Sequence, residues 1–260
     1  RIINEDFQKL NADTSKTRAE FKDRAANLSL EFKLATIAPD GSCTEGITRT
    51  YDPVNTIEDF VDGDLEAKGA VPPWDRNKYL NIWVVTEIRS NSEGTILGYA
   101  QFPGQGASTD GVVIRHDRVG TIGTARAGDR GRTLTHEIGH WLSLFHPFQG
   151  GCSNTNDRVA DTPPVAEPSY GCPTNNNSCS NDFPDEIDNV ENFMDYSNGS
   201  CMNMFTEGQK RRVEASLANN NLRGRVISAS NLQATGVNVV PNCGPIADFW
   251  IRSERTVICQ

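Results

Sequence analysis

Three of the four histidines in the chain fall in one short segment, and their spacing restricts how the chain can fold around them. The segment reads HEIGHWLSLFH, and its histidines are His136, His140 and His146. Residues four apart lie on one face of a helix, so the first two imidazoles project together, about one turn apart. On a continuous helix, a residue six positions beyond His140 would lie about 120° off that face and about 9 Å further along the axis. His146 can therefore join the other two only if the helix ends near residue 143 and the chain turns back, and Pro147 is consistent with such a stop.

The residue types in this segment suit a zinc site. Two neutral histidines one turn apart are zinc ligands, and Glu137 can reach a water molecule bound between them and act as a general base. HExxH alone also occurs in ordinary helices, but a third histidine at this distance matches the metzincin pattern HExxHxxGxxH. Ser143 stands at the glycine position of that pattern. A serine in the left-handed conformation expected there costs roughly 1 kcal/mol.

Length and charge exclude several other classes of protein. The chain has 260 residues, enough for one large domain or two small ones. No apolar run approaches the ~20 residues needed to span a bilayer. The net charge of −9 argues against a partner that is a nucleic acid or an anionic membrane.

Hydrophobic periodicity predicts a chain of mixed helices and strands. A capping box at Thr206 and Gln209, with Phe205 before it, marks the start of the last helix. The segment 96–104 contains proline and glycine, so we expect an edge strand there. The expected helices are 4–27, 56–69, 132–146 and 205–218, and the expected strands are 28–35, 46–52, 72–88, 96–104 and 111–120.

Between residues 147 and 190 the chain is rich in Asn, Asp, Pro, Gly and Ser, and so long a loop needs cross-links or bound ions to hold it. Four of the seven cysteines cluster there or just beyond. No pair has C-x-x-C spacing, which favours disulfides in an oxidising compartment over a zinc ribbon, with buried free thiols as the alternative. Four cysteines allow three pairings. The clustered cysteines are Cys152, Cys172, Cys179 and Cys201, and Cys43, Cys243 and Cys259 remain outside the cluster.

Several motifs that recur in order resemble the pappalysin family of metzincins, especially its secreted prokaryotic members. They are PWDRNKYLNIWV, LGYAQFPG, the histidine segment, DRVADTP, YGCP, NFMDYS and FTEGQ. The resemblance covers roughly residues 72–225 well and 1–71 loosely.

This resemblance implies an α/β (α+β) metzincin fold. We expect a twisted five-stranded mixed sheet, with a backing helix and the active-site helix above a cleft, and with the family's first strand upstream of residue 1. Below the cleft we expect an irregular subdomain with a Met-turn and a C-terminal helix, cross-linked by disulfides and stabilised by calcium. The catalytic domain would span 1–225, its upper part ending near 146, followed by a linker at 226–242. Residues 243–260 resemble the opening strands of a PKD-type β-sandwich.

The function implied by the resemblance is that of a secreted zinc-dependent endopeptidase acting on proteins or peptides. One Zn²⁺ would be held by the three histidines, with Glu137 as general base on a zinc-bound water. Tyr196 would stabilise the oxyanion, and Met194 would form a structural floor below the metal. Substrate would pair with the edge strand at Gly98, Tyr99 and Ala100.

The resemblance also implies one or two structural Ca²⁺ ions and a disulfide pattern. The calcium ligands would come from the DRVADTP loop, and the pairings would be Cys152–Cys179 and Cys172–Cys201. A solvated acidic loop is the alternative reading of that motif. The calcium-binding residues expected from the family are Asp157, Val159, Asp161 and Thr162.

Substrate preference departs from the family pattern. Members that cleave before Lys or Arg carry an aspartate at the position of Gly199, where an acidic pocket floor can pair with a basic side chain. Asp195 or Glu191 would have to take that role here.

We expect a monomer. The alternative functions are a non-catalytic binding or adhesion module stabilised by zinc and calcium, and a zinc hydrolase of non-peptide bonds. An intact Glu137 argues against the first, and an edge strand suited to peptides argues against the second.

Overall fold

The protein is described by a computed structural model that covers residues 1–51, 57–59, 66–89, 96–153, 156–180 and 184–238. Its elements, in chain order, are α1 (Ile2–Phe7), η1 (Ala12–Lys16), α2 (Ala19–Lys22), β1 (Ile57–Asp59), α3 (Glu66–Ala70), β2 (Ile82–Val85), β3 (Glu87–Arg89), β4 (Gly98–Ala100), η2 (Ala107–Thr109), β5 (Val112–Arg115), η3 (His116–Arg118), α4 (Arg132–Trp141), α5 (Glu207–Ala218) and α6 (Ala229–Ala234).

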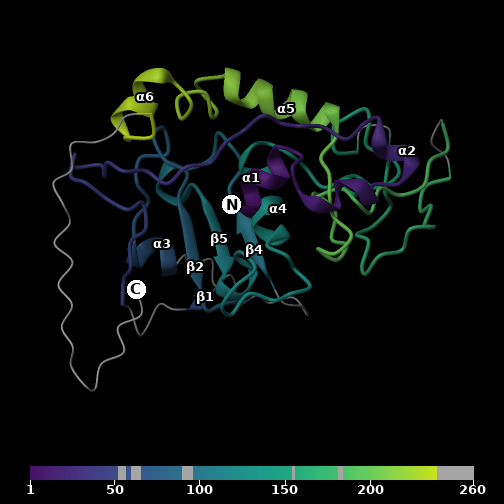
Figure 1. Cartoon of the computed structure of the whole chain (residues 1–260), viewed down its shortest axis with the longest axis horizontal. Coiled ribbons are helices and arrows are strands. Elements are labelled where there is room, and N and C mark those ends of the chain that lie inside the picture. The colour runs from purple at the N-terminus through teal and green to yellow at the C-terminus, as the bar shows by residue number, and fades with distance from the viewer. Residues whose placement is uncertain (52–56, 60–65, 90–95, 154–155, 181–183, 239–260) are drawn as a thin grey trace.

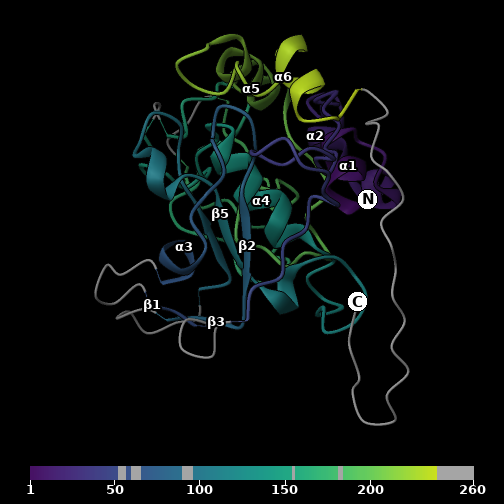
Figure 2. The ribbon, with the colours of Figure 1, turned by 90° about the vertical axis from the view of Figure 1, so that its left-hand side faces the viewer.

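A three-stranded mixed sheet lies between α3 and α4, which cover its opposite faces (Figure 2). The strand order is β2-β5-β4, with β2 parallel and β4 antiparallel to the central strand β5. Val112, Val113 and Ile114 of β5 are all fully buried, because both faces of this strand are covered. β4 is an edge strand, as predicted, and it lies beside α4.

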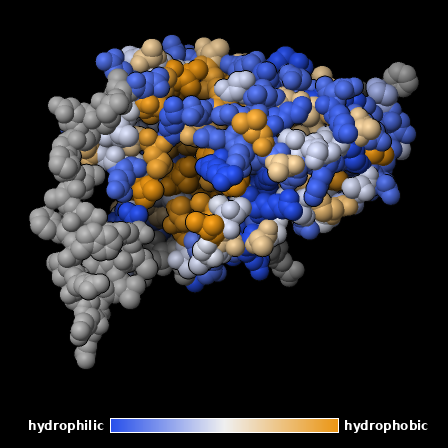
Figure 3. Space-filling model, viewed as in Figure 1, coloured by the Kyte–Doolittle hydropathy of each residue, from blue (hydrophilic) through white to orange (hydrophobic). Residues whose placement is uncertain are grey.

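At the edge of the sheet opposite β4, strand β2 alternates between buried and exposed residues. Trp83 and Val85 pack inward, whereas Ile82 and Val84 are 38% and 55% exposed. Apolar residues gather over the strands on the face shown in Figure 3. A second, two-stranded parallel pair, β1 with β3, lies next to α3 (Figure 2).

The predicted five-stranded sheet is not seen in the described residues, where the larger sheet has three strands. The segment 28–35, although it alternates like a strand, forms none. Instead, the Leu30 carbonyl accepts from the Gln8 side chain, and the backbone of Phe32 both donates to and accepts from the Asn4 side chain. A strand requires a ladder of hydrogen bonds to a neighbour, and no described strand pairs with this segment.

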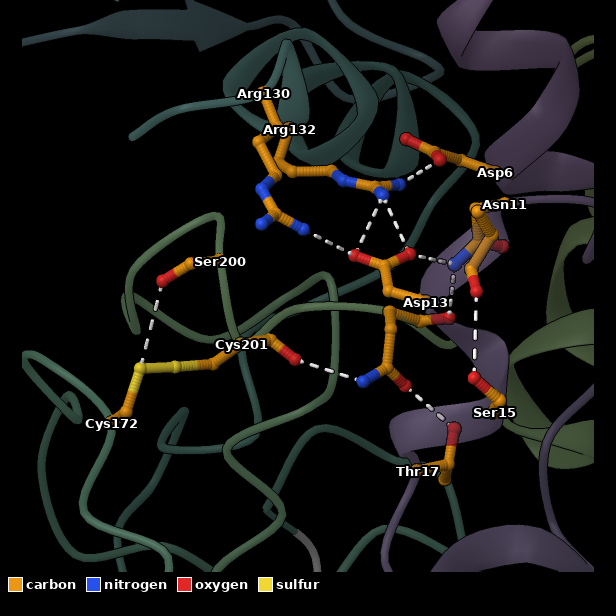
Figure 4. A network of polar contacts seen from close by, with 12 residues as sticks. Asp6, Asn11, Asp13, Ser15, Thr17, Arg130, Arg132, Cys172, Ser200 and Cys201 are labelled. Atoms are coloured by element: carbon orange, nitrogen blue, oxygen red, sulfur yellow. Dashed lines mark hydrogen bonds and ion pairs between the residues drawn. A yellow bond between two sulfur atoms is a disulfide. The ribbon is translucent and has the colours of Figure 1, made fainter. Parts of the chain in front are cut away.

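The predicted helix 4–27 is broken into α1, η1 and α2. The break follows from tertiary hydrogen bonds of two polar residues, Asn11 before η1 and Asp13 within it. Asn11 donates to the carbonyl of Asn203, and Asp13 accepts from Arg132 at the start of α4 (Figure 4). These buried contacts hold the backbone in a shape that a continuous helix could not adopt. The predicted helix 56–69 is likewise shorter, and its described part comprises β1 and α3.

Between α4 and α5 the described residues form turns and bends, with no helix and only isolated bridges (Figure 1). The predicted disulfides Cys152–Cys179 and Cys172–Cys201 are both present, with Cα–Cα distances of 5.4 and 6.0 Å. Cys43 is disulfide-bonded as well, and Cys243 and Cys259 lie outside the described residues.

The capping box predicted for the last helix is present at the start of α5. The Thr206 side chain accepts from the Gln209 backbone N–H, and the Gln209 side chain accepts from the Thr206 N–H at 2.9 Å. Beyond α5, part of the predicted linker is ordered as α6. The carbonyl of Thr235, just past α6, accepts from the backbone of Thr36 and Ile37, so this part packs onto the domain. The expected sandwich segment 243–260 lies outside the described residues. In the part of the chain that the structure covers, no helix has the length and apolar character needed to cross a membrane.

Candidate active site

The three histidines of the sequence motif converge on one point. The Nε2 atoms of His136 and His140 are 3.1 Å apart, and that of His146 lies 3.1 Å from the first and 2.8 Å from the second. A tetrahedral zinc ion with Zn–N bonds of about 2.0 Å would separate its ligand atoms by about 3.3 Å. The three nitrogens are therefore spaced as ligands of a single ion, and they form the one metal-ligand cluster found among the described residues.

Burial keeps these imidazoles in the neutral form that binds metals. It lowers the pKa of His140 to about 4, that of His146 to about 3, and that of His136 well below its ordinary value. Backbone carbonyls orient two of the rings. The Nδ1 atom of His136 lies 2.8 Å from the carbonyl of Phe193, and that of His140 lies 2.7 Å from that of Leu144. A proton held on Nδ1 leaves Nε2 free as a metal ligand.

The chain reverses after α4 as the sequence predicted. α4 ends at Trp141, and Ser143 has a φ of 84°, in the left-handed region. The Leu144 N–H then donates to the carbonyl of Gly139 at 2.9 Å. This turn brings His146 back to the face that carries the first two histidines.

Glu137 lies beside the edge strand. Its side chain is buried, and burial raises its pKa to about 8. A Cβ atom at Gly98, the first residue of β4, would lie 3.0 Å from Glu137 Cγ and 3.3 Å from its Oε1. The absence of a side chain at Gly98 therefore lets β4 approach the glutamate closely.

The predicted Met-turn lies on the other side of the histidines. Met194 is fully buried, and its sulfur packs directly against Gly139 of α4, where no side chain larger than hydrogen would fit. Tyr196 is 43% exposed, and its ring centroid lies 4.9 Å from that of His146 and 5.6 Å from that of His136. Burial raises the pKa of Tyr196 to about 12, so its hydroxyl stays protonated near neutral pH.

Three of the four residues expected to bind calcium come together. The Thr162 hydroxyl lies 2.8 Å from both carboxylate oxygens of Asp157 and 2.9 Å from the carbonyl of Val159. Asp161 points elsewhere. It accepts from the Thr206 hydroxyl and the Gly208 N–H, both at 2.8 Å, and so caps α5.

None of the three residues considered from the sequence for an acidic pocket floor is available for that role. Gly199 packs so closely on the backbone of Asp129 that a Cβ atom there would overlap the Asp129 carbonyl. Asp195 is fully buried and accepts from the Ser169 N–H at 3.1 Å. Glu191 is buried and paired with Arg18 at 2.6 and 2.7 Å.

Aromatic rings that sequence reasoning missed surround the histidines. Phe102 follows β4, and its ring lies 5.3 Å from that of His140 and 5.0 Å from that of Phe145. Phe148 stacks on His146 at 4.5 Å. The only signal in the sequence was the position of Phe145 and Phe148 on either side of His146.

A buried ion-pair network at the start of α4 was also missed. Arg132, the first residue of α4, is 5% exposed and pairs with Asp6 and Asp13, while Arg130 pairs with Asp13 at 3.1 Å (Figure 4). These residues lie more than 100 positions apart in sequence, so no local pattern could have linked them. The network ties the N-terminal segment to the helix that carries the first two histidines.

Comparison with known proteins agrees with this geometry. The family described as pregnancy-associated plasma protein-A, Peptidase_M43, matches residues 64–218. Extracellular metalloprotease 1 of Coccidioides posadasii is 42% identical over 142 residues, which are 52% of this chain and 48% of that protein. An extracellular metalloprotease of Verticillium alfalfae is 42% identical over 146 residues, 53% of this chain and 49% of that protein. The chain thus spans about half the length of these curated relatives.

Solved structures match over more of the chain. Mature mirolysin of Tannerella forsythia, in complex with a cleaved peptide, superposes with a TM-score of 0.76 at 36% identity, covering 90% of this chain and 87% of mirolysin. A promirolysin mutant from the same organism superposes with a TM-score of 0.77 at 35% identity, covering 90% of this chain and 77% of promirolysin.

Proposed function

This chain belongs to the pregnancy-associated plasma protein-A family of peptidases, and from this premise we propose that it is a secreted zinc endopeptidase. The observation that carries the proposal is the convergence of three imidazole nitrogens beside a buried glutamate and an edge strand. The names of the curated relatives support secretion, and so do the disulfides, which persist in oxidising compartments.

His136, His140 and His146 would hold the zinc ion. Their neutral state and their mutual distances of 2.8–3.1 Å fit a three-histidine catalytic site, which leaves the fourth position open. When bound, zinc acts as a Lewis acid that polarises the scissile carbonyl and acidifies the attacking water.

Glu137 would be the general base. Burial raises the pKa of Glu137, which makes its carboxylate a stronger base toward the attacking water, and the resulting acid can pass that proton to the leaving amine. Tyr196 would donate a hydrogen bond to the developing oxyanion, because its ring lies beside those of His136 and His146. Met194 would support the site from below without binding the metal.

β4 would position the substrate. Gly98, Tyr99 and Ala100 pair with β5 on one side, and no other described strand pairs with the opposite edge. An extended peptide can add to such an edge by main-chain hydrogen bonds, which depend little on its sequence. The start of β4 lies against Glu137, so a peptide bound there would pass in front of the base.

We infer a structural calcium site at the loop of Asp157, Val159 and Thr162. The Thr162 hydroxyl lies within 2.9 Å of oxygens of both other residues, and the carboxylate of Asp157 is fully buried. Burial raises the pKa of Asp157 to about 7, as expected for a carboxylate that lacks a sufficient counter-charge in the protein alone. A Ca²⁺ ion prefers oxygen ligands of this kind and would supply that charge. Asp161 is left out of this site, because it caps α5.

We propose a monomer whose catalytic domain spans 1–225, with α6 of the expected linker packed onto it.

The test compares the parent with Glu137→Gln, using casein and peptides derived from it. The zinc-loaded parent should cleave them, lose activity in 1,10-phenanthroline, and recover it on addition of zinc. Glu137→Gln should retain one zinc per chain and the parent's melting temperature but lose about 10²–10⁴ in kcat/KM. Glu214→Gln, an exposed position on α5, provides the matched control. A zinc-loaded parent that binds peptides without cleaving them would contradict the proposal and favour a binding module.

A further inference from the structure

Two arginines stack on one aromatic ring beside the proposed active site. The guanidinium of Arg158 lies 5.4 Å from the centroid of the Phe145 ring, and that of Arg212 lies 4.8 Å from it. The two cations come from different segments, the loop after Cys152 and helix α5. Burial and the nearby charge of Arg158 lower the pKa of Arg212, and the charge of Asp157 offsets part of that shift.

Neither arginine is paired with a carboxylate among the described residues. Arg212 donates from Nε to the carbonyl of Ser143, and Arg158 takes part in no hydrogen bond or ion pair there. Asp157 attracts Arg212 electrostatically but forms no ion pair with it, because its buried carboxylate accepts from the Thr162 hydroxyl and the Val159 N–H. A cation–π contact accounts for one guanidinium on a ring, but a second like charge beside it raises the energy of the pair unless an anion joins them.

A cavity of about 550 Å³ opens next to this pair. It is lined by Phe145, Gln149, Gly150, Ser153, Asn156 and Arg158. Apart from Arg158 the lining residues are neutral, so the charge that lines the cavity is positive. Arg158 holds a left-handed backbone conformation, with a φ of 63°, and its side chain is exposed to the solvent in front of the cavity.

The cavity lies close to the metal ligands. Phe145 directly precedes His146, and its ring contacts Phe102, which contacts His140. A peptide strand advances about 3.4 Å per residue, so a side chain one to three residues from the scissile bond can reach this region.

The direction in which a bound peptide runs along β4 decides on which side of the scissile bond the cavity lies. Glu137 lies at Gly98, the first residue of β4, and Phe102 lies four residues further along the chain. Antiparallel pairing is the commoner arrangement for an added strand. A peptide paired in that way runs opposite to β4, so the residues near Phe102 and Phe145 are those on the N-terminal side of the scissile bond.

Building on the proposed function, we propose that Arg158, Arg212 and Phe145 form a substrate subsite for an acidic side chain within three residues on the N-terminal side of the scissile bond. A carboxylate placed there would accept charge-assisted hydrogen bonds from the guanidinium groups and remove their mutual repulsion. The free C-terminal carboxylate of a substrate lies on the other side of the scissile bond, so the ligand is a glutamate or aspartate side chain.

The experiment uses the zinc-loaded protein and quenched peptides based on one cleaved sequence, with Glu, Gln or Ala at each of the three positions before the scissile bond. At one position the parent should prefer Glu over Gln by about tenfold in kcat/KM, because exposure weakens each ion pair. Arg158→Gln should reduce that ratio to about twofold or less. Arg211→Gln removes the same charge from an exposed position next to Arg212 and should leave the ratio at the parent's value.

A binding measurement separates the subsite from the chemistry. In a Glu137→Gln background, the Glu peptide should bind more tightly than the Gln peptide, and Arg158→Gln should abolish the difference. The preference should also weaken as the salt concentration rises, since part of it is electrostatic. Arg212→Lys provides a second variant, which keeps the charge but loses the planar guanidinium on the ring.

Several outcomes would overturn the proposal. One is a parent that cleaves Glu and Gln peptides equally well at all three positions. Another is a preference that survives Arg158→Gln and Arg212→Lys, or one found only on the C-terminal side. Cleavage of the Ala peptides with no effect of the arginines would leave the protease assignment intact and reject only the subsite. No cleavage of any peptide would reject the proposed function itself.

Discussion

Arg212 of α5 donates a hydrogen bond from Nε to the carbonyl of Ser143, 2.6 Å away, at the residue where the chain reverses after α4. The side chains of Ser143 and Ser216 also meet, with their hydroxyl oxygens 3.1 Å apart. The helix that closes the domain thus fixes the turn that delivers His146 to the other histidines. The metal site therefore depends on α5 as well as on α4.

Replacing Ser143 by glycine tests the strain in this turn. A non-glycine residue in the left-handed region costs about 1 kcal/mol, which glycine avoids. The substitution also removes the contact with Ser216, worth about 0.5–1 kcal/mol. We expect Ser143→Gly to leave the free energy of unfolding within about 0.5 kcal/mol of the parent in urea denaturation. Ser216→Ala, which loses only the contact, should be the less stable of the two, and the reverse order would contradict this account.

A buried ion pair connects the C-terminal part of the chain with the end of α4. Arg223 is 1% exposed and binds Asp110 through both terminal nitrogens, at 2.7 and 2.9 Å. It also donates to the carbonyls of Trp141 and Gln101, so it joins α4 to the segment just after β4. Arg223→Met should cost about 3–5 kcal/mol of stability, because it leaves the Asp110 carboxylate buried without its partner.

The double variant Arg223→Met with Asp110→Leu separates the charge from the packing. It removes both ions and should be more stable than the single variant, as measured by urea denaturation. Arg225→Met, at an exposed position two residues away, should change stability by no more than about 0.5 kcal/mol. A double variant less stable than Arg223→Met alone would show that the hydrogen bonds to the backbone matter more than the charge.

Calcium removal should destabilise the irregular half of the molecule. At a calcium concentration about 100 times the dissociation constant, bound calcium adds about 2.7 kcal/mol, so a calcium-selective chelator should lower the melting temperature while zinc stays bound. Asp157→Asn should abolish this difference between the two buffers. Asp161→Asn, which weakens only the cap of α5, should lower stability equally with and without calcium. A calcium response that Asp157→Asn leaves intact would place the ion elsewhere.

The metal site could be predicted from the sequence because local geometry determines most of it. The spacing of His136, His140 and His146 required a helix end near residue 143, and the positive φ of Ser143 confirms it. The capping box at Thr206 was equally local. These features depend on neighbours a few residues away, which a sequence displays directly.

The rest of the site depends on contacts between distant residues. Nothing in the sequence links Arg132 with Asp6 and Asp13, or Arg158 with Arg212, and Asp161 became a helix cap because α5 happens to pack against its loop. The strand predicted at 28–35 fails for the same reason, since a strand exists only where a partner lies beside it. The substitution of aspartate at Gly199, which the family pattern suggested, would collide with the backbone of Asp129.

The pH dependence of stability should reveal the buried carboxyl group of Asp195 in the Met-turn. Its Oδ1 accepts from the N–H groups of Ser169 and Tyr196, whereas its Oδ2 is buried and has no hydrogen-bond partner among the described residues. Burial raises the pKa of this carboxyl group above its ordinary value. The folded protein therefore holds a proton at pH values where the unfolded chain, with a pKa of about 3.9, has released it.

The variant Asp195→Asn tests this buried acid, because it keeps the acceptor at Oδ1 but cannot ionise. In the parent, the stabilisation from the protonated form is complete below the unfolded pKa and is lost as the pH rises through the folded pKa, so ionisation of Asp195 destabilises the protein above it. We therefore expect the unfolding free energy of the variant, measured in urea from pH 4 to pH 8, to increase relative to that of the parent as the pH rises. The difference between the two proteins should then become constant. A difference between the two proteins that stays constant over this range, or that shrinks with rising pH, would show that Asp195 is not the buried acid described here.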